Sequence, residues 1–488
     1  MPIPVPTREY NLDTQDSVDI DLLGVGFGPS NMALAIALQE QGWASASTDV
    51  NATDHQQTFG SDRAPRALFL EASTETTWHP GLLFEDASLQ VCFAKDLVSF
   101  RNPTSPFSFL NFLVDQGRVH DFFNRGSFAP LRVEFIAYLR WAAEQLGQWV
   151  RRGERVVAVR PRRRDGEIIG YDVDSVTGDG NITTRRARHV VIAAGLRAHL
   201  PEDFPDHPAA FHSGEYLHRI GDLRDVRTAV VIGGGQSAAE AALETHRRFP
   251  NATVHLVHSR FGLIPSDATP FANRIFDNPS VDTLFHAPEH VRDRLHRVHA
   301  NTNNSVVHEH TLQELYDAWY IGSWTGREQL VLHDVSTVLG VTVTESAASQ
   351  EAAAHSTDSA PLRVDVLHEM DGTQISIDAD LVVAGTGYEP VDPSALLGEA
   401  AAELVRDHAG RLRAERDYSL IWNTQASAKL FATGVTQHQH GLSVTLLSNI
   451  ALRAGEIIEA LHPVIAEPES RPVNAEHLSA VALTGQGL

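Results

Sequence analysis

Two apolar segments of this chain each run into a glycine-rich turn and then into a helical pattern. The first of these units covers residues 18–39 and contains the turn GVGFGPSN. The second covers residues 229–246 and contains the turn GGGQSAAE. Glycines at a strand-to-helix corner let a pyrophosphate approach the backbone N–H groups of the helix N-terminus. A lone glycine-rich turn is weak evidence, but the flanking strand and helix favour binding. Two such units predict an α/β fold with two Rossmann-like dinucleotide-binding domains.

The first turn has the features of an FAD site. The residues expected to contact FAD there are Gly24, Gly26, Gly28, Pro29 and Asn31. Asn31 stands where a third glycine is usual. Glu71 ends the apolar segment ALFLE, the place for an acid that binds the ribose hydroxyl groups. The polar stretch 45–66 explains the long spacing, and an ordinary strand-end carboxylate is the alternative interpretation of Glu71.

The second turn predicts an NADPH site. The residues expected to contact NADPH there are Gly233, Gly235, Gln236 and Ser237. Ala238 takes the place of the third glycine, and Arg260 follows the next strand, TVHLVH. A cation at that position suits a 2′-phosphate and favours NADPH over NADH. The alternative is that Arg260 is only a solvated strand-end charge.

A third element, AGTGY at residues 384–388, follows an apolar segment at 381–384. In two-dinucleotide flavoproteins a late strand of this kind returns to the first domain, so we expect the NADPH domain to be inserted in the FAD domain. The predicted division is 1–210 and 379–465 for the FAD domain and 211–378 for the NADPH domain with its small substrate-binding region. The stretch 345–360 reads as a solvated loop and 466–488 as a weakly ordered tail.

Composition excludes several other classes of protein. The 488 residues carry a net charge of −23, which argues against nucleic acid or an anionic membrane as a partner. Cys92 is the single cysteine, which excludes a redox-active dithiol and a thiolate metal cluster and fits a cytoplasmic protein. No secretory signal and no run of 18 apolar residues is present. The pairs His308/His310 and His438/His440 suggest no metal, because 25 histidines make chance neighbours common.

The order of several motifs resembles that of a known family, the class B flavin-dependent N-hydroxylating monooxygenases that act on ornithine or lysine in siderophore biosynthesis. The resemblance extends from about residue 19 to about residue 461. Its blocks are GVGFGPSN, WHPGLLF, LQVCFAKDLVSFRNPTSPFSFLNFL, GGGQSAAE, PSDATPFANRIFD, NTNNSVV, GTGY and HGLSVTLLS. The resemblance implies that NADPH reduces FAD, that reduced flavin and O2 form a C4a-hydroperoxide, and that the neutral side-chain amine of the substrate is hydroxylated. No protein nucleophile is then required.

The resemblance also implies roles for individual residues. Lys95 would pair with the α-carboxylate of the substrate, Asn273 would bind its α-amino and α-carboxylate groups, and Asn303 would bridge substrate and nicotinamide. Gln90 would lie beside the flavin as a positioning residue, and Ser448 would lie where substrate and flavin meet, with Ser443 as the alternative. The further expected contacts to FAD are Trp78, His79, Val156 and Leu446. The further expected contacts to NADP are Asn304 and Ser305.

The chain departs from the family pattern at several positions. Asn304 replaces a tyrosine, which would loosen the hold on NADP+, and Val444 and Ala94 replace an aspartate and a leucine. The predicted substrate is L-ornithine, because the block DLVSFRNPTSPFSFLNFL reads closer to the ornithine branch. L-Lysine stays the alternative, since one methylene changes binding by only about 1–3 kcal/mol. Lys95 disfavours diamines, and the family implies a homotetramer or a homodimer.

Other classes share the two-dinucleotide layout. A pyridine nucleotide–disulfide reductase needs a dithiol that a chain with only Cys92 lacks. Baeyer–Villiger and other class B monooxygenases are disfavoured by the PFAN and NTNN blocks. A flavin- or NADP-sensing binding protein would show no amino-acid-stimulated NADPH oxidation.

Overall fold

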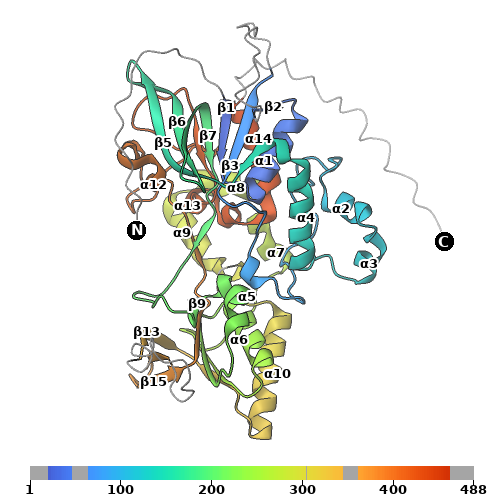
Figure 1. Cartoon of the computed structure of the whole chain (residues 1–488), viewed down its shortest axis with the longest axis vertical. Helices are drawn as coiled ribbons and strands as arrows, with labels where there is room; N and C mark the ends of the chain where they lie inside the picture. The colour runs from blue at the N-terminus through green and yellow to red at the C-terminus, as the bar shows by residue number, and fades with distance from the viewer. Residues whose placement is uncertain (1–19, 47–63, 304, 345–360, 462–488) are drawn as a thin grey trace, which may run out of the picture.

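The computed structural model describes residues 20–46, 64–303, 305–344 and 361–461. Two α/β units lie one above the other along the long axis of the molecule (Figure 1). The first is built on a mixed sheet whose central strands are parallel and the second on an all-parallel sheet, each with helices against it, which confirms the predicted α/β fold class. The predicted loop at 345–360 and the predicted tail at 466–488 lie outside the described residues.

The first sheet has the strand order β2-β3-β1-β7-β6-β5, with β4 beside β3 and β18 beside β7. The pairs β1/β3, β1/β7 and β7/β18 are parallel, whereas β5/β6 and β6/β7 are antiparallel. Buried on both faces, the central strands read as continuous apolar runs rather than alternating ones. The strands are β1 (Ile20–Val25), β2 (Ala44–Ser45), β3 (Arg66–Glu71), β4 (Val150–Arg152), β5 (Glu154–Arg164), β6 (Glu167–Thr177), β7 (Ile182–Ile192) and β18 (Leu430–Ala432).

Five helices of the first unit pack on one face of this sheet, whereas the short helix α12 (Ser394–Leu397) packs against the other face. The nearly all-apolar helix α1 lies against α14, and its residues 31–38 are all buried. An aromatic cluster joins α2, α3 and α4, with Phe109 and Tyr138 at 5.4 Å between ring centroids. The helices are α1 (Pro29–Glu40), α2 (Phe109–Asp115), α3 (Val119–Asn124), α4 (Arg132–Gln145) and α14 (Ile450–Leu461).

The second sheet is all parallel, in the order β12-β11-β10-β16-β9. Neighbouring residues of β10 serve opposite faces: Val231 packs with helix α6, and Val230 packs with the antiparallel sheet β13-β14-β15. The strands are β9 (Ala210–His212), β10 (Thr228–Ile232), β11 (Thr253–Val257), β12 (Leu330–His333), β13 (Ser336–Val343), β14 (Leu362–His368), β15 (Gln374–Ala379) and β16 (Leu381–Ala384). The remaining helices are α5 (Tyr216–Arg219), α6 (Gln236–Arg248), α7 (Pro270–Asn273), α8 (Asn278–His286), α9 (Glu289–Val298), α10 (Glu309–Thr325) and α13 (Gln437–His440).

The chain passes between the units through a two-stranded ribbon, in which β8 (Leu196–Ala198) pairs antiparallel with β17 (Tyr388–Pro390). The second unit is therefore an insertion between these strands. One part of the expected division is wrong: β16 does not return to the first sheet but lies between β9 and β10 in the second. The strand that returns is β18, which pairs with β7.

No helix within the described part of the chain is long and apolar enough to cross a membrane.

Candidate functional site

The turn between β1 and α1 is shaped for close approach by a ligand. Gly26 has φ +84°, and a Cβ there would lie 2.5 Å from the carbonyl oxygen of Ala193. At Gly28, the residue that precedes α1, a Cβ would have no heavy atom of the protein within 4 Å. Pro29 opens the helix, where a missing N–H costs nothing. The turn therefore leaves open space before a helix N-terminus.

Asn31 holds this turn in shape. It is fully buried, and its Nδ2 donates to the carbonyl oxygens of Gly26 at 2.7 Å and Val25 at 3.2 Å. Its Oδ1 is buried and has no hydrogen-bond partner in the described structure. The residue that replaces the usual glycine thus adds hydrogen bonds that glycine cannot make, and leaves one acceptor unpaired.

Glu71 ends β3 beside the same turn. Its carboxylate accepts hydrogen bonds from the backbone N–H of Phe27 at 2.7 Å and of Ser73 at 2.8 Å. Each carboxylate oxygen has a second acceptor position. The structure therefore places Glu71 at the turn, as the sequence predicts, and leaves it capacity for ribose hydroxyl groups.

The segment Trp78–His79 lies where the two units meet. His79 adopts a left-handed conformation with φ +47°, and its ring lies 4.6 Å from that of Trp78 and 5.8 Å from that of Tyr388, between centroids. Burial, reinforced by the charge of Arg132, lowers the pKa of His79 to about 4. The imidazole is therefore neutral at physiological pH.

The second glycine turn brings three distant sequence blocks together. A Cβ on Gly233, which has φ +131°, would lie 2.3 Å from the carbonyl oxygen of Gly385, and one on Gly385 would lie 2.6 Å from the Cβ of Ala238. A Cβ on Gly235 would lie 3.3 Å from the Cα of Ser305. The GGGQSAAE, GTGY and NTNNS blocks thus meet at the start of α6.

The side chains of the predicted NADP contacts differ in how many of their polar atoms already have partners within the protein. Both ends of the Gln236 amide are engaged: Nε2 donates to Glu240 at 2.8 Å, and Oε1 accepts from the N–H of His308 at 2.6 Å. Ser237 is half-buried in the first turn of α6. Arg260 is half-buried beyond the end of β11, and its guanidinium has no ion pair with any described residue.

Lys95 and the PFANRIFD block meet at the predicted substrate site. The Nζ of Lys95 lies 5.9 Å from the ring centroid of Phe276, and Lys95 is half-buried without an ion pair among the described residues. Burial lowers the pKa of Lys95, and the carboxylate of Asp277 opposes that shift. The Nδ2 of Asn273 donates to the carbonyl of Ala268 at 2.9 Å, which leaves its Oδ1 for other partners.

The other expected contacts are scattered around this region. Gln90 is exposed, and Asn303 is half-buried at the end of a short helical turn. Asn304, the residue in place of the family tyrosine, lies outside the described residues. Val156 is buried in β5. In the segment before α14, Ser443 and Ser448 are buried and Leu446 is partly exposed.

Sequence reasoning missed Asp277, although it ends the quoted block PFANRIFD. It also missed the ion pair of Arg132 with Glu240, which joins the two units at 2.7 Å. An acid inside the GGGQSAAE block was the available signal for Glu240.

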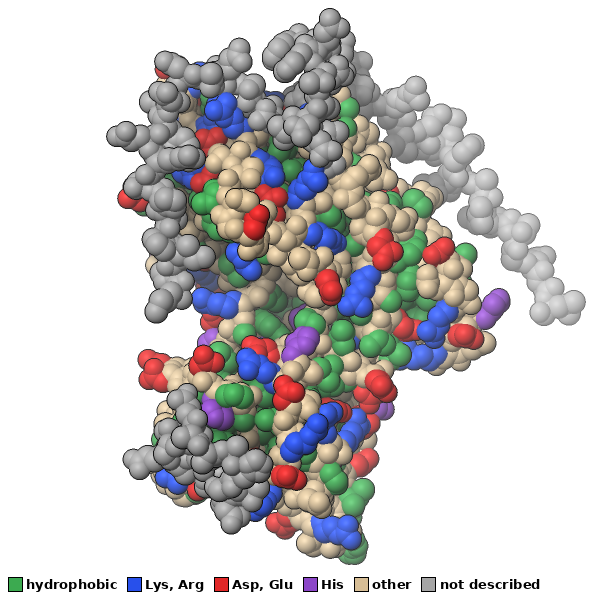
Figure 2. All heavy atoms as spheres, viewed as in Figure 1, with side chains coloured by type: hydrophobic (Ala, Val, Ile, Leu, Met, Phe, Trp, Pro, Cys, Tyr) green, Lys and Arg blue, Asp and Glu red, His purple; other side chains and the backbone are tan. Residues whose placement is uncertain are grey.

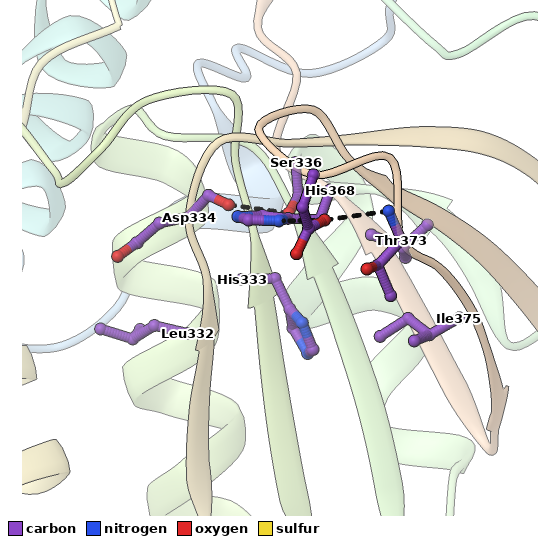
Figure 3. Close-up of a pocket in the computed structure, with 9 residues that line it drawn as sticks. Leu332, His333, Asp334, Ser336, His368, Thr373 and Ile375 are labelled. Carbon is purple, nitrogen blue, oxygen red and sulfur yellow. Dashed lines mark hydrogen bonds and ion pairs between the residues drawn. The ribbon is translucent and has the colours of Figure 1, made fainter.

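A pocket of about 370 Å³ lies apart from all these residues, between β12 and the small antiparallel sheet (Figure 3). His333 and His368 line it, and His368 pairs with Asp371 at 2.8 Å. No predicted site residue lines this pocket. Within the described residues, no three His, Cys, Asp or Glu side chains are placed to hold a metal ion.

In the space-filling view, the molecule narrows on its left side between the two units (Figure 2).

Residues 19–390, more than half of the chain, match the model of the L-lysine 6-monooxygenase/L-ornithine 5-monooxygenase family. The chain belongs to this family. Its relatives include the L-ornithine N(5)-monooxygenase of Pseudomonas aeruginosa, which is 35% identical over 92% of this chain and 95% of that protein. Membership confirms the resemblance drawn from the motif order.

Solved structures of similar proteins match both units of this family member together. The ornithine N-hydroxylase of Kutzneria sp. 744, described with reduced FAD, NADP+ and L-ornithine, has a TM-score of 0.80 and 35% identity, over 91% of this chain and 98% of that one. The L-lysine 6-monooxygenase of Pseudomonas syringae has a TM-score of 0.73 and 29% identity, over 91% and 99%. The higher similarity is to the ornithine enzyme.

Proposed function

We propose that this protein is an NADPH- and O2-dependent L-ornithine N5-monooxygenase. The observation that carries the proposal is Lys95, a half-buried cation without an ion pair among the described residues, beside Phe276 and the block that holds Asn273. A cation so placed suits the α-carboxylate of an amino acid. The names of the relatives and the ornithine described in the Kutzneria structure support the choice of substrate.

The residues around the two turns fit the two cofactors. The cradle at Gly26 and Gly28, the unpaired Oδ1 of Asn31 and the carboxylate of Glu71 suit FAD. The turn at Gly233 suits the diphosphate of NADPH, and Arg260, which has no ion pair with a described residue, suits the 2′-phosphate. Bound flavin, once reduced by NADPH, supplies the activation of O2. The protein positions the amine and excludes water.

The remaining predicted residues complete these sites in the proposal. Trp78, His79, Gln90, Val156 and Leu446 contact FAD. Ser237, Asn303, Asn304 and Ser305 contact NADP, and the backbone of Gln236 does so in place of its engaged side chain. Asn273, Asn303 and Ser448 bind the amino acid.

We assign the domains accordingly. The first unit with the returning β18 binds FAD, and the insertion between β8 and β17 binds NADPH, with β16 inside it. We further propose a cytoplasmic homo-oligomer, a tetramer or a dimer, that serves hydroxamate siderophore biosynthesis. The family resemblance and the single cysteine support this.

The test is hydroxylamine formation by the purified, FAD-loaded protein with NADPH and L-ornithine, L-lysine or putrescine. We expect product with ornithine in preference to lysine, and little with putrescine, which lacks the carboxylate. Lys95→Met should raise the KM for ornithine and remove the preference over putrescine. Product from lysine alone would make the chain an L-lysine N6-monooxygenase, and equal turnover of putrescine by the unmodified protein would overturn the role of Lys95.

A further inference from the structure

The most buried of the described ion pairs between the two units joins α4 to α6. Arg132, the first residue of α4, meets Glu240 of α6 in a two-pronged contact, with Nη1 to Oε2 at 2.7 Å and Nη2 to Oε1 at 2.8 Å. The two side chains are 13% and 9% exposed. Bidentate arginine–carboxylate pairs are geometrically specific, and burial protects this pair from screening by salt.

Each partner is bonded onward to a different part of the proposed site. Nη1 of Arg132 also donates to the carbonyl of Leu82 at 3.0 Å, three residues after the FAD-contacting His79. Glu240 accepts from Gln236, whose Oε1 accepts from the N–H of His308. One chain of hydrogen bonds therefore runs from the flavin side through α6 to the segment that follows Ser305.

The backbones of the two units also approach each other closely at this junction. A Cβ on Gly81 would lie 2.0 Å from the carbonyl oxygen of Gly214, so the two units touch without side chains there. A second ion pair, Arg247 with Asp86 at 3.2 Å, also joins α6 to the first unit, but its side chains are 44% and 66% exposed. Exposed pairs of that kind contribute little.

We propose that Arg132 and Glu240 are positioning residues that fix α6, and with it the second glycine turn, against the flavin-contacting segment. The assignment of NADP+ to this turn and of FAD to the other segment rests on the proposed function. Because α6 begins at that turn, its placement sets where the nicotinamide meets the flavin and how long NADP+ stays bound. Loss of the pair should then loosen NADP+ and let activated oxygen escape as hydrogen peroxide.

The test compares Arg132→Gln and Glu240→Gln with the unmodified FAD-loaded protein. We expect the NADP+ dissociation constant, measured by calorimetric titration without amino acid, to rise about tenfold or more, because hydrogen bonds between charged groups are the strong ones. We also expect that more of the NADPH oxidation will produce hydrogen peroxide and less will produce the hydroxylamine. Flavin content should stay near that of the unmodified protein.

Three controls separate positioning from general stability. Asp86→Asn removes the exposed ion pair with Arg247 of the same helix, leaves the pair of Arg247 with Glu314 intact, and should change NADP+ affinity by less than about twofold. The exchanged variant Arg132→Glu/Glu240→Arg should regain part of the affinity. If Arg132→Gln does not fold, Arg132→Lys keeps the charge, loses the two-pronged contact and should still weaken NADP+.

Folded, flavin-loaded single variants that bind NADP+ within twofold of the unmodified protein would overturn the proposal. Because this titration needs no substrate, failure of the unmodified protein to hydroxylate ornithine would overturn the proposed function alone. Amide hydrogen exchange in α6 gives a readout without ligand. Faster exchange in the single variants supports the positioning role of the Arg132–Glu240 pair, and unchanged exchange counts against it.

Discussion

At the scale of single residues, Lys95 is held in an unfavourable state. Burial costs a cation hydration, and the described structure supplies no ion pair in return, although the ring of Phe276 and the charge of Asp277 favour the ammonium. An ammonium in this position is set to gain from an arriving carboxylate. The same burial makes the charge itself dependent on pH.

The pH dependence of substrate binding follows from this environment. Burial lowers the pKa of Lys95 below that of an ordinary lysine, so its ammonium is complete below the lowered value and is lost as the pH rises through it. We expect the KM for L-ornithine to rise on the alkaline side at a lower pH than an ordinary lysine would give. Lys95→Arg keeps its charge there. Profiles of KM against pH should therefore differ between the two proteins, and identical alkaline limbs would contradict the role of Lys95.

At the scale of elements, local patterns predicted both strand–turn–helix units but not which strand completes each sheet. The segments at 381–384 and 430–432 are both short, apolar and followed by Thr and Gly nearby, as in AGTG and ATG. Their sheets differ because pairing is decided by contacts far along the chain, with β10 for one and β7 for the other. The ion pair of Arg132 with Glu240 was not predicted for the same reason, because the two residues are 108 positions apart in the sequence.

The turn between β1 and α1 allows a test that separates folding from cofactor binding. Gly28 has φ −78° and room for a methyl group, so Gly28→Ala should change the stability of the flavin-free protein by no more than about 1 kcal/mol. The methyl group would occupy the space through which a pyrophosphate approaches the backbone, so FAD content should fall sharply. Absorbance of the purified variant near the flavin band, with denaturant unfolding of the apoprotein, measures both quantities.

Gly221→Ala is the matched control, because a Cβ there also meets no heavy atom within 4 Å and the residue belongs to a short helix that is part of neither glycine turn. It should retain FAD fully. A Gly28→Ala protein with normal flavin content would remove this turn from the FAD site.

At the scale of the whole molecule, each unit has a buried core of its own beside a shared boundary. The clusters on both faces of the first sheet and on one face of the second hold residues of a single unit, whereas the cluster on the other face of the second sheet also holds Leu82, Phe84 and Ala87 of the first unit. The helices α8 and α9 of the insertion also pack against α13. Domains with their own cores tend to unfold as separate cooperative units. In Figure 1 most of the insertion lies in the lower part, while its helices α8 and α9 lie in the upper part beside α13.

Ligands should therefore stabilise the two units selectively. A ligand at 100 times its dissociation constant adds about 2.7 kcal/mol, which raises the Tm of a unit of this size by several degrees. Scanning calorimetry should show two transitions, with FAD raising one and NADP+ raising mainly the other. NAD+, which lacks the 2′-phosphate expected at Arg260, should act more weakly at equal concentration. A single transition that FAD and NADP+ shift equally would mean that the contacts between the units couple them completely, and would contradict independent unfolding.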